Sequence, residues 1–204
     1  MNREQWLNEC IQRLRPDFEK AGYFLPEKIR ASCSWPSKNG LAKKKRWIGE
    51  AWSSKNSGDG TTEVFISPVL KDPIYVASTL VHELVHCAVG VEEGHRGQFP
   101  RAARALGLEG KMTETAAGET LRAHLQEITD AIGPYLHAEL TRSNAPKSQK
   151  CRLLKVICST CGCICRMSRK AIDEVGCPTC ACGSPMIEEK GEDGEDGQTL
   201  RLLC

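Results

Sequence analysis

Residues 72–90 read DPIYVASTLVHELVHCAVG and carry the clearest structural signal in the chain. Asp72 is a favourable N-cap, Pro73 suits the first helical position, and Gly90 is placed to end a helix. Residues 73–89 contain no further helix breaker. The segment therefore predicts one helix, and its many apolar residues predict that the helix is largely buried.

Two histidines on this helix can share one metal ion. His82 and His86 are four residues apart, which separates them by about 40° around the helix axis. Glu83 lies beside that face. A zinc ion lowers the pKa of a bound water to about 7, and a nearby carboxylate can take the proton. The pattern predicts a catalytic zinc site with Glu83 as the base, although a buried helix can also hold two hydrogen-bonded histidines.

A catalytic zinc site needs a third protein ligand. We expect His95, because the segment before it turns the chain and Gly94 leaves room for close approach. Eight residues separate His86 from His95, which is longer than the metzincin spacing. The rival third ligands are three later carboxylates, Glu109, Glu114 and Glu119. We interpret the remaining two histidines, His124 and His137, as ordinary polar side chains.

The cysteines predict a second metal site. Eight of the 12 lie between Cys151 and Cys182, and clustered cysteines in a chain without an export signal are more often metal ligands than disulfides. The run from Cys158 to Cys161, followed by Gly162, is typical of a zinc knuckle. Four thiolates form a closed structural site. The partner pair must come from three candidates: Cys177, Cys180 and Cys182.

The segment HELVHCAVGVEEGHRGQF resembles the SprT-like family of zinc metallopeptidases, in which a Gly-His pair and an aromatic residue follow the HExxH helix. These match Gly94, His95 and Phe99 here. The resemblance implies a zincin-like fold and the hydrolysis of peptide bonds. It implies that His82, His86 and His95 bind the catalytic zinc. It also implies that Glu83 is the general base. It also implies substrates that are bound to DNA or crosslinked with it.

The layout is similar to that of phage and prophage members of the family. They share a segment like CSWPSKNGLAKKKRWIGEAWS, a strand like EVFISP and a terminal cysteine module, so the resemblance spans residues 25–188. Their Cys-x-Cys-Gly arrangement favours Cys180 and Cys182 as partners of Cys158 and Cys161, with Cys177 as the alternative. Two further cysteines depart from the family pattern and are expected not to be ligands: Cys163 and Cys165.

The remaining patterns predict an α+β domain. An amphipathic helix covers residues 2–15 and is expected to end at Pro16, three short strands fall at 29–35, 46–52 and 63–67, and further helices cover 97–106 and 116–132. The strands predict a small antiparallel or mixed sheet. We therefore expect a zincin-like metallopeptidase domain at residues 1–140.

Charge divides the rest of the chain. Residues 1–141 carry 18 basic and 18 acidic side chains, residues 142–170 carry eight basic and no acidic ones, and residues 171–204 carry two basic and eight acidic ones. We expect a basic linker at 141–150, a zinc ribbon at 151–188 and an acidic disordered tail at 189–204. The candidates for contact with DNA or RNA are six cations: Lys150, Arg152, Lys155, Arg166, Arg169 and Lys170.

The composition, 40% hydrophobic, is compatible with a folded core. No apolar run approaches the length of a membrane span, and the polar start MNREQWLNEC does not resemble a signal peptide. We expect a cytoplasmic zinc metallopeptidase with one catalytic and one structural zinc and a protein or peptide substrate. The alternatives are a nucleic-acid-binding zinc protein with an inactive peptidase-like site and a metal-dependent hydrolase of another substrate.

Overall fold

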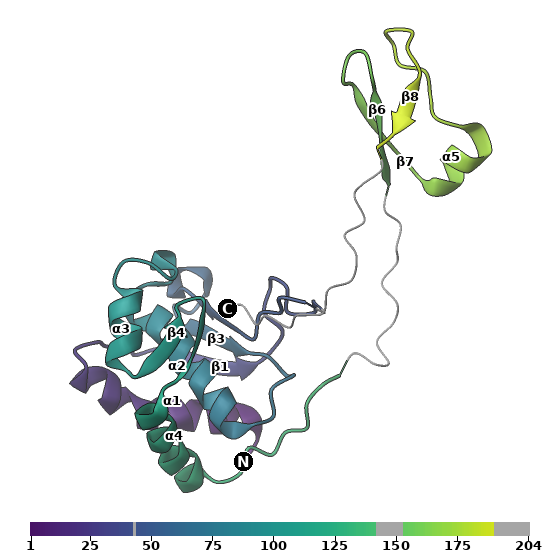
Figure 1. Ribbon diagram of the computed structural model, residues 1–204. Helices are drawn as coiled ribbons and strands as arrows, with labels where there is room; N and C mark the ends of the chain where they lie inside the picture. The colour runs from purple at the N-terminus through teal and green to yellow at the C-terminus, as the bar shows by residue number, and fades with distance from the viewer. Residues whose placement is uncertain (43, 142–152, 190–204) are drawn as a thin grey trace. The chain divides into compact units, whose positions relative to one another are not determined.

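The computed structural model describes residues 1–42, 44–141 and 153–189 (Figure 1). Within these residues the chain forms two compact units, one over residues 1–141 and one over 153–189. Most of the predicted linker and acidic tail lies outside the described residues, as do two of the candidate cations, Lys150 and Arg152.

The first unit begins with α1 (Arg3–Lys20). Asn2 and Gln5 form a capping box at its start. The prediction that this helix ends at Pro16 is wrong, because the helix continues for four residues beyond it. Pro16 removes one backbone donor on an exposed face, while Phe18 extends the buried stripe and is fully buried.

The sheet of this unit is small and mixed. It consists of β1 (Ile29–Cys33), β2 (Gly49–Trp52) and β3 (Thr62–Ile66) in the order β1-β3-β2. Strand β1 runs parallel to β3, and β2 runs antiparallel to it. Ala31, Val64 and Ile66 are fully buried on one face, and β2 forms an edge of the sheet that continues into the 3-10 helix η1 (Ser54–Asn56).

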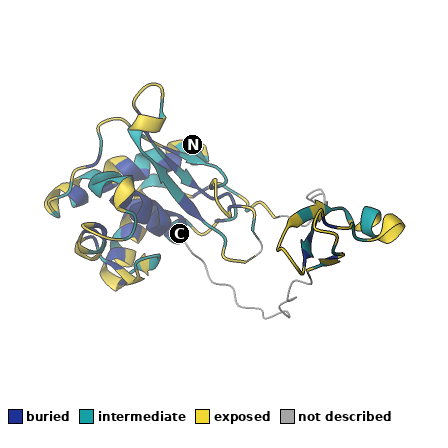
Figure 2. Cartoon of the chain, turned by 90° about the horizontal axis from the view of Figure 1, so that it is seen from above, coloured by how far each residue is buried: buried dark blue, intermediate teal, exposed yellow. Residues whose placement is uncertain are grey.

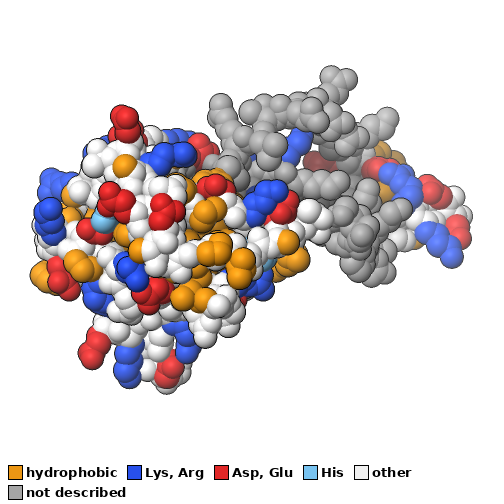
Figure 3. Space-filling model, turned by 90° about the horizontal axis from the view of Figure 1, so that it is seen from below, with side chains coloured by type: hydrophobic (Ala, Val, Ile, Leu, Met, Phe, Trp, Pro, Cys, Tyr) orange, Lys and Arg blue, Asp and Glu red, His pale blue; other side chains and the backbone are white. Residues whose placement is uncertain are grey.

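The helix α2 (Pro73–Val89) packs against β2, β3 and the other helices of the unit. Figure 2 shows the buried residues gathered in the interior between the sheet and the helices. After α2 come η2 (Val91–Glu93), α3 (Phe99–Ala105), the hairpin of β4 (Leu108–Lys111) and β5 (Glu114–Ala117), and α4 (Glu119–Ile132). On the face of this unit seen in Figure 3, acidic, basic and hydrophobic side chains are interspersed.

The β4–β5 hairpin corrects the prediction of a helix over residues 116–132. Ala116 and Ala117 belong to β5, where they pair with Glu109 and Leu108. Alanine favours helix locally, but the pairing with β4 and the extended backbone of Gly118 delay the helix to Glu119.

The second unit is a three-stranded antiparallel sheet with one short helix. Its strands are β6 (Leu154–Cys158), β7 (Ile164–Met167) and β8 (Met186–Glu188) in the order β7-β6-β8, and α5 (Arg169–Val175) follows β7. The buried core contains four residues, Val156, Cys158, Cys180 and Met186. Together the two units are of mixed α and β structure with small sheets.

Candidate metal centres

The helix α2 carries the first candidate site into the interior. The side chain of Asp72 accepts a hydrogen bond from the N–H of Tyr75 at 2.7 Å, and Gly90 ends the helix with φ of 104°. His82, Glu83 and His86 are all buried, with exposed fractions of 1%, 3% and 8%. Buried polar groups require hydrogen-bond partners, opposite charges or a metal ion, so the neighbours of these three side chains indicate what the site can bind.

Three imidazole rings converge at this site. The Nε2 atom of His95 lies 3.1 Å from Nε2 of His82 and 3.3 Å from Nε2 of His86. Tetrahedral zinc with Zn–N bonds of about 2.05 Å would place its nitrogen ligands about 3.3 Å apart. The spacing therefore fits a single metal ion of this size. His95 reaches the site because η2 and Gly94, with φ of 55°, turn the chain back.

The histidines are in the form that a metal requires. Burial lowers the pKa of His82 to about 3, and His86 and His95 add to the effect. Burial likewise lowers the pKa of His86 to about 3 and lowers the pKa of His95. Neutral imidazoles offer a lone pair to a cation, whereas protonated ones repel it.

Two residues orient the histidines. The Oγ1 atom of Thr115 on β5 lies 2.7 Å from Nδ1 of His82. A hydrogen bond at Nδ1 leaves Nε2 to face the metal position, as is usual for histidine ligands. The ring of Phe99, fully buried at the start of α3, lies 4.3 to 5.0 Å from all three imidazole centroids. Sequence reasoning missed Thr115, because residues 116 onward were expected to be helical and no local motif marks this residue.

Glu83 is one of the residues that line a cleft next to His86 and His95. The cleft has a volume of about 410 Å³, and its lining includes Glu83, His86, His95, Trp47 and Gly49. A Cβ atom at Gly49 would overlap the carboxylate of Glu83, so only glycine fits there without a shift. Burial raises the pKa of Glu83 to about 8, and the charge of Glu50 contributes to the increase.

The second candidate site is formed by four thiols in the second unit. The Sγ atoms of Cys158 and Cys182 are 3.5 Å apart, and those of Cys161 and Cys180 are 3.4 Å apart. All four ligand atoms lie within 4.8 Å of one another. Tetrahedral zinc with Zn–S bonds of about 2.3 Å would place its sulfurs about 3.8 Å apart. The cluster thus fits a zinc ion with modest adjustment.

Both cysteine turns use left-handed glycines. Gly162 has φ of 71° and donates its N–H to the carbonyl of Cys158, and Gly183 has φ of 86° and donates to the carbonyl of Cys180. Backbone N–H groups of Cys161 and Thr160 lower the pKa of Cys158, which favours the thiolate that binds metal. The turns therefore bring the sulfur atoms together and stabilise the thiolate of Cys158.

The other cysteines and carboxylates of the predictions are placed elsewhere. Cys177 and Cys165 are half-buried and pack against the core of the second unit, and Cys163 is exposed. Among the described residues, the groups able to hold a metal are the His82 group and the Cys158 group. These groups include none of the rival ligands Glu109, Glu114 and Glu119. Of the remaining histidines, His124 pairs with Asp17 at 2.8 Å, and His137 contacts the guanidinium of Arg3 at 3.0 Å.

Three of the four described cations that are proposed to contact nucleic acid form ion pairs within the second unit. Lys155 pairs with Glu189 at 2.7 Å, Arg169 pairs with Glu188, and Lys170 lies 3.7 Å from Glu174. Residues 153–189 contain four basic and four acidic side chains. The described part of this unit is therefore electrically balanced.

Comparison of the chain with protein-family models, with curated proteins and with solved structures found no match. Among the described residues, each helix is too short or too polar to cross a lipid bilayer.

Proposed function

We propose that this chain is a zinc-dependent metallopeptidase of the SprT-like type, with a zincin-like first unit and a structural zinc in the second. The observation that carries the proposal is that Nε2 of the half-buried His95 lies 3.1 Å from Nε2 of His82 and 3.3 Å from Nε2 of His86, both of which are buried, beside the carboxylate of Glu83. Neutral imidazoles so close together present mutually repelling lone pairs unless a cation or protons lie between them. Three histidines with an adjacent open cleft suit a catalytic rather than a structural metal.

When bound, zinc would polarise a peptide carbonyl and activate water. The residues of the chain supply the remaining functions. His82, His86 and His95 would hold the ion, and Thr115 orients the first of these. Glu83 lines the cleft next to His86 and His95, where its carboxylate can accept a proton and later donate it to the leaving amine.

The position of the cleft favours an extended polypeptide as the substrate. It lies against β2, the edge strand of the sheet, and its lining includes Gly49, Glu50 and Ala51 of that strand. An extended peptide can add to such an edge through main-chain hydrogen bonds. The resemblance of the HELVH segment to SprT-like enzymes further suggests proteins associated with DNA or crosslinked with it as the natural substrates.

The proposal is tested by digestion of casein with the zinc-loaded protein. We expect cleavage that a chelator abolishes and that added zinc restores. Absence of cleavage of both casein and a DNA-crosslinked protein by a protein that retains two zinc ions would contradict the proposal. That result would favour the alternative of a zinc protein whose peptidase-like site is inactive.

A further inference from the structure

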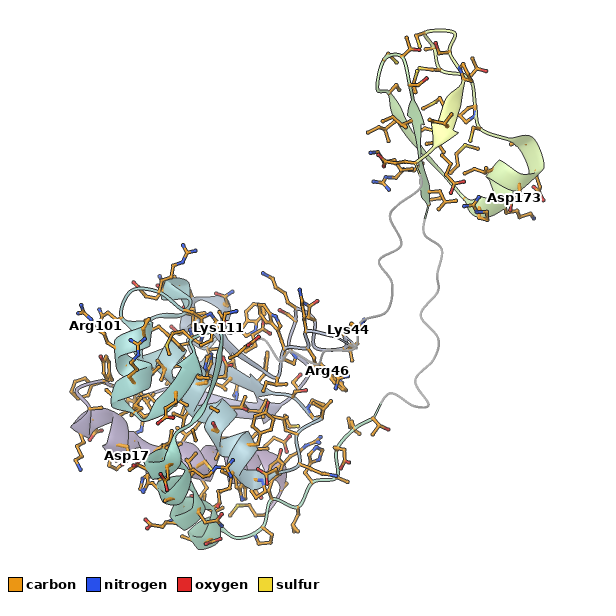
Figure 4. All side chains as sticks on the ribbon, in the orientation of Figure 1. Asp17, Lys44, Arg46, Arg101, Lys111 and Asp173 are labelled. Carbon is orange, nitrogen blue, oxygen red and sulfur yellow. The ribbon has the colours of Figure 1, made fainter. Side chains whose placement is uncertain are left out.

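The two faces of the sheet in the second unit differ in what covers them. Side chains alternate between the faces of a strand, and the buried Val156 and Cys158 place the core on one face of β6. The helix α5 packs on this face, because its Ile172 contacts the core. Figure 4 shows α5, marked by Asp173, to one side of the three strands. We call the opposite face, which α5 leaves accessible, the outer face. It carries the side chains of Lys155, Ile157, Ile164, Arg166, Ile187 and Glu189.

Three isoleucines form a row across the outer face. Ile157 on β6 pairs with Ile164 on β7 and with Ile187 on β8, and neighbouring strands are about 4.8 Å apart. Ile164 and Ile187 have exposed fractions of 52% and 54%. The solvated face of an antiparallel sheet normally carries polar side chains. The row therefore indicates a face that another surface covers.

A second row, of charged residues, runs beside the isoleucines. Arg166 on β7 pairs with Lys155 on β6, and the carbonyl of Lys155 accepts the N–H of Glu189 at 3.0 Å. The ammonium of Lys155 lies 2.7 Å from the carboxylate of Glu189. Arg166 is exposed and forms no ion pair with the described residues of its unit. The row is thus positive at its β7 end and negative at its β8 end.

The two rows are complementary to themselves. Facing sheets pack about 10 Å apart with their strands within about 30° of each other. A twofold axis parallel to β6, midway between two such sheets, places β7 of one copy opposite β8 of the other. Ile164 then faces Ile187 of the second copy, and Arg166 faces its Glu189. The side chain of Lys155 reaches Glu189 on the β8 side, so the two Lys155 ammonium groups are drawn away from the axis.

We infer that the outer face is the interface of a homodimer of this chain. Most homodimers have a twofold axis and bring the same patch of both copies together, and the charge pattern of this face suits that arrangement. The strands contain only three to five residues. Interfaces below about 1,200 Å² are typical of weak complexes, so we expect a reversible dimer with a dissociation constant in the micromolar range or above.

Dimerisation does not require catalysis. Its consequence, that two candidate catalytic clefts are joined in one particle, rests on the proposed function, whereas the dimer itself does not. The inference also gives Arg166 a role in contact between two copies of the chain instead of contact with nucleic acid.

The first test is sedimentation velocity with the full-length, zinc-loaded protein over concentrations from about 1 µM to about 0.5 mM. We expect the sedimentation coefficient to rise with concentration from that of one chain to that of two. Ile164→Lys and Ile187→Lys should each weaken association at least about tenfold, because a charge would be buried in the apolar row. Val175→Lys is the control, since Val175 is 78% exposed but lies on α5.

The second test uses the charged row. R166E and E189K each place like charges opposite one another in a dimer of identical copies, so each should weaken association at least about tenfold. In a mixture of the two variants, a dimer of one copy of each again brings opposite charges together at both ends. We therefore expect the mixture to associate more tightly than either variant alone. Hydrogen exchange of β6 in dilute samples shows whether each variant keeps its fold.

Three results would overturn the inference. One is a protein that stays monomeric over the whole concentration range. Another is a dimer that I164K and I187K weaken no more than the Val175 control does, since the chains would then meet through another surface. The third is a mixture of R166E and E189K that associates no better than its components, since this would contradict the twofold arrangement. Each result can be obtained with a protein that has no peptidase activity.

Discussion

The carboxylate of Glu83 on α2 occupies the space in front of Gly49 on β2, where a Cβ atom would overlap it. The two residues are 34 positions apart in the sequence, yet the fit determines how deeply the candidate base can sit. Glycine at position 49 is thus part of the site, because it lets the carboxylate lie between the helix and the sheet edge.

Gly49→Ala is expected to push the Glu83 side chain away from β2. Overpacking of a tight interior typically costs about 1–3 kcal/mol of stability, and displacement of the base should reduce peptidase activity while zinc remains bound. Denaturant unfolding and casein digestion measure the two effects. Gly58→Ala is the control, since a Cβ there meets nothing within 4 Å; equal effects of both variants would contradict the role of Gly49.

Glu83→Gln tests the base directly. The amide preserves the size of the side chain but cannot accept a proton, so we expect normal zinc content and a loss of activity of about 10²- to 10⁴-fold. Metal analysis and a digestion assay on the same preparation provide the measurement. Undiminished proteolysis would refute the assignment of Glu83.

The two metal groups predict two zinc ions per chain. His82→Ala should remove one ion and Cys158→Ser the other, because each group offers its own set of ligands. Mass spectrometry under native conditions counts the ions in each variant. Retention of two ions in either variant, or simultaneous loss of both in a protein whose first unit remains folded, would be inconsistent with independent sites.

Thr115→Val removes the hydrogen-bond partner of His82 with little change in shape. Loss of such a partner typically lowers metal affinity about 10- to 100-fold, which competition with a chelating dye can measure. Thr120→Val on the exposed start of α4 serves as the control. Similar zinc affinities in the two variants would indicate that Thr115 does not orient the ligand.

Removal of zinc should affect the two units differently. The first unit has a large hydrophobic core, whereas the core of the second contains only four residues, two of which are cysteines of the metal group. A unit this small depends on its metal for stability. We therefore expect a strong chelator to unfold residues 153–189 and leave the first unit folded. Hydrogen exchange monitored by peptide would show this, and persistent protection of β6 after zinc removal would contradict it.

Local sequence patterns were sufficient to predict where the main helices lie, but they did not predict the strands of the β4–β5 hairpin. Helix α2 begins at Pro73, after the N-cap Asp72, and ends before Gly90, as the propensities of these residues predict. Such local prediction succeeds because capping and φ restriction act within a few residues. Pro16 did not end α1, since burial of Phe18 outweighs one lost hydrogen bond. The β4–β5 hairpin could not be foreseen from Ala116 and Ala117, because alanine favours helix until another strand supplies pairing.

The sequence by itself determined the ligand types and their local spacing: His82 and His86 one helical turn apart, and Cys158 and Cys161 in one tight turn. Those relationships depend only on helix and turn geometry. The tertiary structure alone decided that Thr115 and Gly49 lie against His82 and Glu83 of α2, and it distinguished Cys182, a member of the thiol group, from Cys177, which packs against the core of the second unit. Such long-range contacts result from packing of the whole unit, in which each position is set by many neighbours rather than by its own residue type.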